Sequence, residues 1–312
     1  MGYSVEAVHL TKTYGTFTAL SDLNLKLEGS KCIGFLGPNG AGKTTTLKIF
    51  TDLIKPTSGT ALINGVDVHK HKMKALESVG TLIETPEVYP SLTPREALNM
   101  TAELRGVPKA ERNKRIDEAV AEVKMQEWVD KRFGKFSKGM KQRICIASAL
   151  ISDPNIVLLD EPTTGLDPRG MSEVRDIVKG LKTSNRLIFM SSHLLAEVTD
   201  VCDEVAMIDH GKLIVYDTIA NVTAKFGGGS VVEVGFLTNV DDPVVAKIRA
   251  LQGVTMVQRS DPTHLTVQFA GGKQTQERLF GQVADMKVGA TSFRETATGL
   301  EEAYLNLIKE TL

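Results

Sequence analysis

The most chemically informative residues form a glycine-rich run that ends in a lysine and two threonines. The run consists of Gly37, Pro38, Asn39, Gly40, Ala41, Gly42, Lys43, Thr44 and Thr45. Glycines let successive backbone N–H groups turn inward around a polyphosphate. Lys43 can then reach the β- and γ-phosphates, and the Thr44 hydroxyl is placed for Mg²⁺. Because the Lys-Thr ending disfavours an ordinary glycine-rich turn, the run predicts a nucleoside triphosphate site.

Two carboxylates form a second candidate site. Asp160 and Glu161 directly follow four apolar residues, 156–159. A continuous apolar run that ends in a carboxylate is typical of a central parallel strand. In phosphate-loop enzymes an aspartate at this place holds Mg²⁺, directly or through water, and Glu161 could orient and deprotonate an attacking water. The alternative is an exposed strand end, which the apolar run disfavours.

A third candidate is the segment around Ser137 and Gly139, which precedes a helix with an apolar stripe. A serine at this position is a good N-cap. It is equally a good anion site, because its hydroxyl and the free N–H groups lie at the positive end of the helix. On its own the segment is better explained as a plain N-cap.

The elements that must position these residues alternate between strand and helix. The apolar run 32–36 and the apolar pattern after residue 46 place the glycine-rich run between a strand and the N-terminal end of a helix. Thr93, Pro94 and Glu96 predict a helix start with a capping box. Further strands are expected at 5–10, 20–27, 59–63, 79–83, 156–160, 187–191 and 205–209, and helices at 111–129, 172–181 and 194–201. The pattern predicts an α/β fold with a parallel sheet covered on both faces.

A glycine-rich joint at residues 227–230 marks the clearest domain boundary. Beyond it, strands are expected at 231–237, 254–258, 265–269 and 288–293. Helices are expected from Asp242-Pro243, over 274–283, and from Thr298 to about 310. The order βαββαβα predicts a small split-βαβ sandwich. No residue in this tail has a catalytic pattern.

Composition disfavours several classes of function. The net charge is −1 and aromatic residues make up 5% of the chain, so neither a basic field nor base stacking favours nucleic acid. No apolar run approaches the length of a membrane span, and the first residues do not resemble a signal peptide. Cys32, Cys145 and Cys202 stand in apolar surroundings, as expected for buried thiols in a reducing compartment.

Across residues 1 to about 225 the chain resembles the ATP-binding subunit of an ABC transporter. Residues 37–45 match Walker A, 136–142 resemble the ABC signature, and 156–161 match Walker B with its catalytic glutamate. Residues 164–167 are similar to the D-loop, and His193 falls on the switch histidine. Tyr14 stands where the family stacks an aromatic ring on adenine.

The resemblance implies a P-loop NTPase with a parallel core sheet, an antiparallel β subdomain and a helical subdomain at about 85–151. It places this ATP-binding domain at 1–226 and a ferredoxin-like accessory domain, βαββαβ, at 229–312. It also implies a head-to-tail homodimer with ATP and Mg²⁺ between the subunits. Lys43, Thr44 and Thr45 of one subunit would hold the phosphates, Ser137 and Gly139 of the other would close over them, and Asp167 would link the two sites.

Two positions depart from the family pattern. Glu84 stands where glutamine is usual, and its carboxylate could still bind Mg²⁺ or a water on it. Glutamate here resembles the branch that exports lantibiotics and bacitracin-like peptides, although it could be a tolerated isostere. Lys138 stands where glycine is common, and its ammonium could help bind phosphate or simply point to solvent.

The function expected from this resemblance is that of a cytoplasmic ATPase, peripheral on the inner face of the cell membrane. It would drive a separate transmembrane permease, with export of a drug or peptide antibiotic, and direct nucleic-acid binding is not expected. One alternative is a soluble ABC-type ATPase that acts on a nucleic-acid or ribosomal partner. Another is a small-molecule kinase, which would leave the Ser137 segment unexplained.

Overall fold

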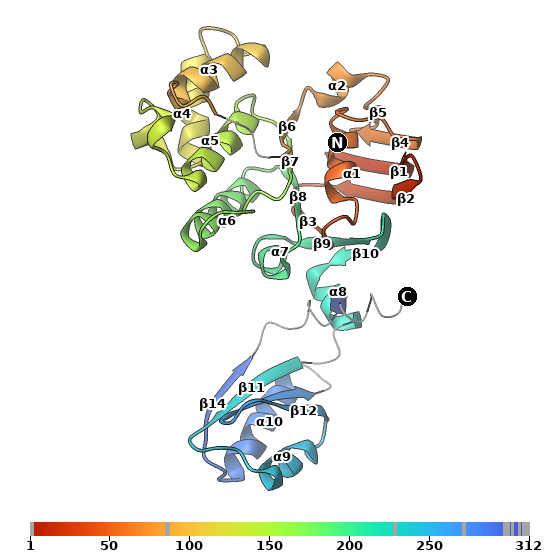
Figure 1. Ribbon diagram of the computed structural model, residues 1–312, viewed down its shortest axis with the longest axis vertical. Coiled ribbons are helices and arrows are strands. Elements are labelled where there is room, and N and C mark those ends of the chain that lie inside the picture. The colour runs from red at the N-terminus through yellow and green to blue at the C-terminus, as the bar shows by residue number, and fades with distance from the viewer. Residues whose placement is uncertain are drawn as a thin grey trace. The chain divides into compact units, whose positions relative to one another are not determined.

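The structure is a computed structural model that describes residues 3–84, 88–226, 230–269, 273–295, and 300, 303, 304 and 307 (Figure 1). Its chain divides into two compact units, Met1–Asp217 and Thr218–Leu312. The glycine-rich joint had suggested a boundary at 226–229. The difference is α8 (Ile219–Phe226), which belongs to the second unit. A glycine-rich run in the sequence indicates a candidate linker, whereas the boundary between the units depends on the contacts that a helix makes.

A six-stranded sheet forms the centre of the first unit. Its order is β10 (Lys212–Thr218), β9 (Glu204–Asp209), β3 (Cys32–Leu36), β8 (Leu187–Ser192), β7 (Ile156–Leu159) and β6 (Val79–Leu82). The pairs from β9 through β6 are all parallel. Every residue of β3, β7 and β8 is buried, which confirms that their apolar runs belong to central strands.

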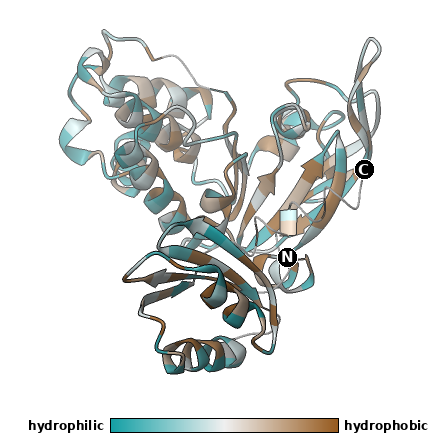
Figure 2. Cartoon of the chain, turned by 60° about the horizontal axis from the view of Figure 1, so that its bottom comes forward, coloured by the Kyte–Doolittle hydropathy of each residue, from teal (hydrophilic) through white to brown (hydrophobic). Residues whose placement is uncertain are grey.

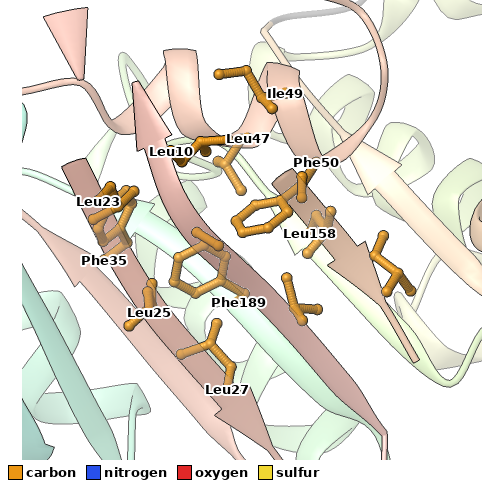
Figure 3. Packing of buried hydrophobic residues seen from close by; sticks show 14 of the residues in the cluster. Leu10, Leu23, Leu25, Leu27, Phe35, Leu47, Ile49, Phe50, Leu158 and Phe189 are labelled. Atoms are coloured by element: carbon orange, nitrogen blue, oxygen red, sulfur yellow. The ribbon is translucent and has the colours of Figure 1, made fainter. Parts of the chain in front are cut away.

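A second, antiparallel sheet contains β2 (Phe17–Glu28), β1 (Ser4–Tyr14), β4 (Ser58–Ile63) and β5 (Val66–Asp67), in that order. One hydrophobic core joins this sheet, the central sheet and α1 (Lys43–Phe50). The ring centroids of Phe35 and Phe189 lie 5.1 Å apart, and those of Phe50 and Phe189 lie 6.4 Å apart (Figure 3). This packing holds Phe50, the last residue of α1, against Phe189 of β8 and so anchors the helix to the central sheet.

Helices between the strands of the first unit are α2 (Lys72–Leu76), α3 (Pro94–Leu104), α4 (Arg112–Glu122), α5 (Lys138–Leu150), α6 (Pro168–Lys182) and α7 (Leu195–Val201). Thr93 and Glu96 form the expected capping box of α3. The helix expected over 111–129 ends at Glu122, because Lys124 has a φ of +55° that no right-handed helix accommodates. Two 3₁₀ turns follow, Gln126–Trp128 and Phe133–Lys135.

The second unit contains β11 (Ser230–Phe236), α9 (Asp242–Arg249), β12 (Val254–Asp261), β13 (His264–Phe269), α10 (Lys273–Asp285) and β14 (Ala290–Glu295). The sheet is antiparallel with the order β12-β13-β11-β14. β13 therefore lies between the two strands that α9 connects, which is a split βαβ arrangement. Most of the helix expected from Thr298 lies outside the described residues.

Hydrophobic residues follow the strands, whereas several helices carry hydrophobic and hydrophilic stripes (Figure 2). Among the described residues, none of the helices combines the length and the apolar character that a membrane span requires.

Candidate functional site

The glycine-rich run forms a tight loop between β3 and α1. Gly40 and Gly42 have φ values of +83° and +106°, a region that favours glycine. A Cβ added to Gly37 would lie 2.2 Å from the carbonyl oxygen of Ile208, and one on Gly42 would lie 2.7 Å from that of Ala19. Because Gly42 at the N-cap has no capping side chain, the first N–H groups of α1 are available to an anion.

Lys43 lies inside this loop, with 4% of its side chain exposed. Its Nζ donates hydrogen bonds to the carbonyl oxygens of Gly37, at 2.8 Å, and Pro38, at 3.1 Å. The same atom lies 3.4 Å from Glu161 Oε1. The loop therefore concentrates positive charge where a polyphosphate would lie.

The strand order brings the first carboxylate to the loop. β3, β8 and β7 are neighbours, and their carboxyl ends meet at one edge of the sheet. Thr44 Oγ1 donates a hydrogen bond of 3.2 Å to Asp160 Oδ1. Ser191, at the end of β8, donates one of 2.6 Å to the same oxygen and accepts one of 2.9 Å from the Glu161 N–H. Ser191 was not predicted as a site residue; its place at the end of an apolar run was the available signal.

The second carboxylate, Glu161, contacts three polar side chains. His193 Nδ1 lies 3.1 Å from Glu161 Oε2, and Thr164 Oγ1 donates a hydrogen bond of 2.9 Å to the same oxygen. Burial raises the pKa of Glu161, but the Thr164 hydrogen bond and the charges of Lys43 and His193 outweigh it, so the pKa lies below its ordinary value. Glu161 is thus kept ionised.

A buried carboxylate, Glu197, orients the segments that carry Glu161 and His193. The hydroxyl of Thr163 donates to its Oε1, and the hydroxyl of Ser192 donates to its Oε2 at 2.7 Å. Only 2% of Glu197 is exposed. No sequence pattern had distinguished Glu197 from the other acidic residues of a helix.

A cavity of about 220 Å³ opens beside the loop. It is lined by Tyr14, Phe17, Ala19, Asn39, Gly40, Gly42, Lys43, Thr44, Thr45 and Glu161. Tyr14 and Phe17 face each other across the β1–β2 hairpin and are 48% and 58% exposed. Two exposed rings beside a phosphate loop offer a stacking surface for a base. Phe17 had not been singled out in the sequence.

Ser137, Gly139 and Asp167 lie at the paired starts of α5 and α6. Ser137 caps α5 by accepting a hydrogen bond of 3.2 Å from Met140 N–H, and Asp167 caps α6 by accepting one of 3.2 Å from Gly170 N–H. A Cβ on Gly139 would lie 3.4 Å from Gly170 Cα. Among the described contacts, none joins Ser137 or Gly139 to the phosphate loop of the same chain.

Glu84 and Lys138, the two positions that depart from the family pattern, have different surroundings in the structure. Glu84 Oε1 lies 2.5 Å from Lys48 Nζ, whereas Thr44 and Asp160 contact each other. The described contacts of Glu84 therefore include Lys48 and neither Thr44 nor Asp160, and the grouping of Glu84 with those two residues around Mg²⁺ stays a prediction. Lys138 is exposed, and its Nζ lies 2.4 Å from where a Cβ on Gly165 would stand.

The residues at the sheet edge fit a magnesium ion. Among the described residues there is no cluster of three or more His, Cys, Asp or Glu side chains that could hold a metal on its own. Thr44 and Asp160 instead present two oxygen atoms beside a loop shaped for phosphate. Mg²⁺ binds through one or two such protein oxygens together with substrate phosphates.

Comparison with known proteins agrees with this geometry. The sequence profile described as "ABC transporter" matches residues 20–164. The bacitracin transport ATP-binding protein BcrA of Bacillus licheniformis is 43% identical over 215 residues, 69% of this chain and 69% of that protein. The chain belongs to the ABC transporter ATP-binding family. The linearmycin resistance ATP-binding protein LnrL of Bacillus subtilis (strain 168) is 28% identical over 309 residues, 99% of each chain.

Solved structures show the same fold. An ATP-binding subunit of an ABC transporter superposes with a TM-score of 0.63 at 28% identity, over 72% of this chain and 93% of that one. CbiO1 from Clostridium perfringens, part of the transporter complex cbiONQ, gives 0.65 at 28% identity, over 72% and 92%. This ABC protein is an ATPase coupled to transport, with the P-loop fold expected from its sequence and an added α+β unit.

Proposed function

We propose that this chain is the ATPase subunit of an exporter for a peptide antibiotic or a similar compound. It acts as a head-to-tail homodimer on the cytoplasmic face of the membrane, bound to separate permease subunits. The observation that carries the proposal is the convergence of Lys43, Asp160, Glu161 and His193 at one sheet edge. The names of the bacitracin and linearmycin relatives support the cargo class.

In this proposal the loop N–H groups and Lys43 bind the β- and γ-phosphates. Thr45 also contacts the phosphates. Thr44 and Asp160 would hold Mg²⁺, which when bound neutralises phosphate charge and orients the phosphates. Tyr14 and Phe17 stack on the base. The exposed rings at the cavity mouth support that role.

Glu161 acts as the general base that accepts a proton from the attacking water. Its ionised state supports this role, because a base must be unprotonated before the reaction. His193 lies within hydrogen-bonding distance of Glu161, and in this proposal it also contacts the γ-phosphate. A contact with both groups would make Glu161 sensitive to the presence of that phosphate.

Ser137 and Gly139 complete the site of the partner subunit rather than their own. Their position at the open N-terminal end of α5 supports this arrangement, because that end presents a hydroxyl and a positive dipole to an incoming anion. Asp167 at the start of the adjacent α6 lies beside them and would connect the two shared sites.

An apolar groove supports docking of the permease. It encloses about 490 Å³ between the end of α1, β6 and the helices α3 and α5. Exposed apolar side chains surround it: Leu53 is 62% exposed, Tyr89 71% and Leu104 87%. A water-soluble surface rarely leaves such residues grouped unless a partner covers them.

A mixing experiment tests the shared sites. Lys43→Ala subunits mixed with Ser137→Arg subunits form heterodimers with one intact composite site and one that carries both mutations. We expect each variant alone to be nearly inactive and the mixture to regain part of the ATPase activity. Confirmed heterodimers without any recovery would contradict the head-to-tail arrangement.

The cargo is tested separately, by producing the chain with its permease in a bacitracin-sensitive host. We expect the minimum inhibitory concentration of bacitracin, or that of linearmycin, to rise. The matched Glu161→Gln variant should abolish the increase at equal protein level. Equal protection by both forms would exclude ATP-driven export as its cause.

A further inference from the structure

The ion pair between Glu84 and Lys48 joins the strand β6 to the helix α1. The atoms Glu84 Oε1 and Lys48 Nζ lie 2.5 Å apart, with 66% and 28% of the two side chains exposed. Glu84 has a φ of +62°, in the left-handed region that is unfavourable for residues with a side chain. Glu84 thus has a strained backbone conformation, and its carboxylate forms an ion pair with Lys48.

The pair lies one helical turn from the residues that would hold the metal. Lys48 follows Thr44 by four positions on α1, so the two side chains share one face of the helix. The carbonyl oxygen of Leu82 accepts a hydrogen bond of 2.7 Å from Asp160 N–H, which places the strand end before Glu84 beside that aspartate. Glu84 therefore follows a strand end that lies against Asp160, and its carboxylate is held by a cation further along α1.

We propose that Lys48 is a positioning residue that holds Glu84 away from the metal position and competes for its carboxylate when metal and ATP bind. This inference rests on the proposed ATPase site. A carboxylate can exchange one cation for another, whereas the neutral amide of a glutamine has no comparable charge preference for the lysine. Lys48 and Glu84 thus function as a matched pair in this chain.

The inference is tested with metal binding rather than turnover. Protein saturated with the non-hydrolysable analogue AMP-PNP is titrated with Mn²⁺, and free Mn²⁺ is measured by EPR. We expect Lys48→Met to tighten Mn²⁺ binding about two- to fivefold, the range that a partly exposed ion pair can supply. Lys48→Arg retains the cation and should bind Mn²⁺ like the wild type.

Two control measurements distinguish the specific ion pair between Lys48 and Glu84 from a general effect of positive charge on Mn²⁺ binding. In Glu84→Gln protein, Lys48→Met should give no further tightening, because the carboxylate that the lysine holds is gone. Lys55→Met, which removes an exposed positive charge beyond α1, should leave the Mn²⁺ affinity unchanged. Thermal unfolding and metal-free AMP-PNP binding confirm that each variant is folded.

The outcomes are distinguishable. No tightening in Lys48→Met, or equal tightening in the wild-type and Glu84→Gln backgrounds, would overturn the role of Lys48 while leaving the ATP site intact. Failure of the wild type to bind Mn²⁺ and AMP-PNP together would overturn the ATP site itself, and the inference with it.

Discussion

Ser191 Oγ lies 2.6 Å from Asp160 Oδ1 and also accepts a hydrogen bond from the Glu161 N–H. One fully buried hydroxyl therefore orients the Asp160 carboxylate and holds the backbone of Glu161. Ser191→Ala should lower ATPase activity about 10- to 100-fold, the usual cost of losing a residue that orients a metal ligand. The measurement is turnover as a function of Mg²⁺ concentration, with Ser148→Ala as a control at a serine outside the site. Normal turnover would show that Asp160 holds its position without Ser191.

Glu161→Gln should retain ATP binding and lose hydrolysis. Because an amide cannot accept the proton of the attacking water, we expect turnover to fall on the order of 10²–10⁴-fold. The variant should accumulate as an ATP-bound dimer, detectable by size-exclusion chromatography with light scattering. Near-normal turnover would remove Glu161 from the role of general base.

Thr164→Val should make hydrolysis more sensitive to acid. The Thr164 hydroxyl lowers the pKa of Glu161, so its removal raises that pKa and protonates the base at a higher pH. We expect similar rates at pH 8 and a larger loss for the variant toward pH 5 in a pH profile of kcat. Superimposable profiles would show that Thr164 does not influence the ionisation of Glu161.

The depressed pKa of Glu161 also has a consequence for folding. A carboxyl whose folded pKa lies below its ordinary value of 4.5 stabilises the fold above that pH, and the contribution disappears as pH falls through the folded pKa. The free energy of unfolding of Glu161→Gln should therefore depend less on pH below 4.5 than that of the wild type. Chemical denaturation at several pH values measures the two slopes, and equal slopes would contradict the shift.

A chain that ends at Asp217 should fold and bind ATP with nearly unchanged affinity. The site residues and the main core all lie in the first unit, and the second unit has its own buried cluster. Permease-stimulated ATPase activity or dimerisation should decrease instead. A chain that ends at Phe226 retains α8 but lacks the rest of the second unit. Its ATP affinity and ATPase activity are compared with those of the shorter chain. A folded truncation that cannot bind ATP would show that the tail contributes to the nucleotide site.

Local spacing was sufficient to predict the phosphate loop and the Asp160–Glu161 pair, whereas the parallel central sheet was predicted from the alternation of strand and helix patterns along the chain. The loop and the pair depend on residues within a few positions of each other: glycines at positive φ, a lysine at a helix start, an apolar run before a carboxylate. The helix over 111–129 was predicted too long, because the left-handed conformation of Lys124 has no local marker. A lysine carries none of the preference for this region that glycine has.

The amino-acid sequence was enough to predict triphosphate binding, a candidate general base and membership of a transport ATPase family, and the comparisons confirm the family. The distant side chains that orient the site residues became visible only in the folded chain. Ser191 reaches Asp160 because β8 lies between β3 and β7, and Lys48 meets Glu84 because α1 packs beside the end of β6. Such contacts depend on strand order and helix packing. Many serines and lysines are chemically equivalent along the chain, and the fold alone selects the ones that meet the site.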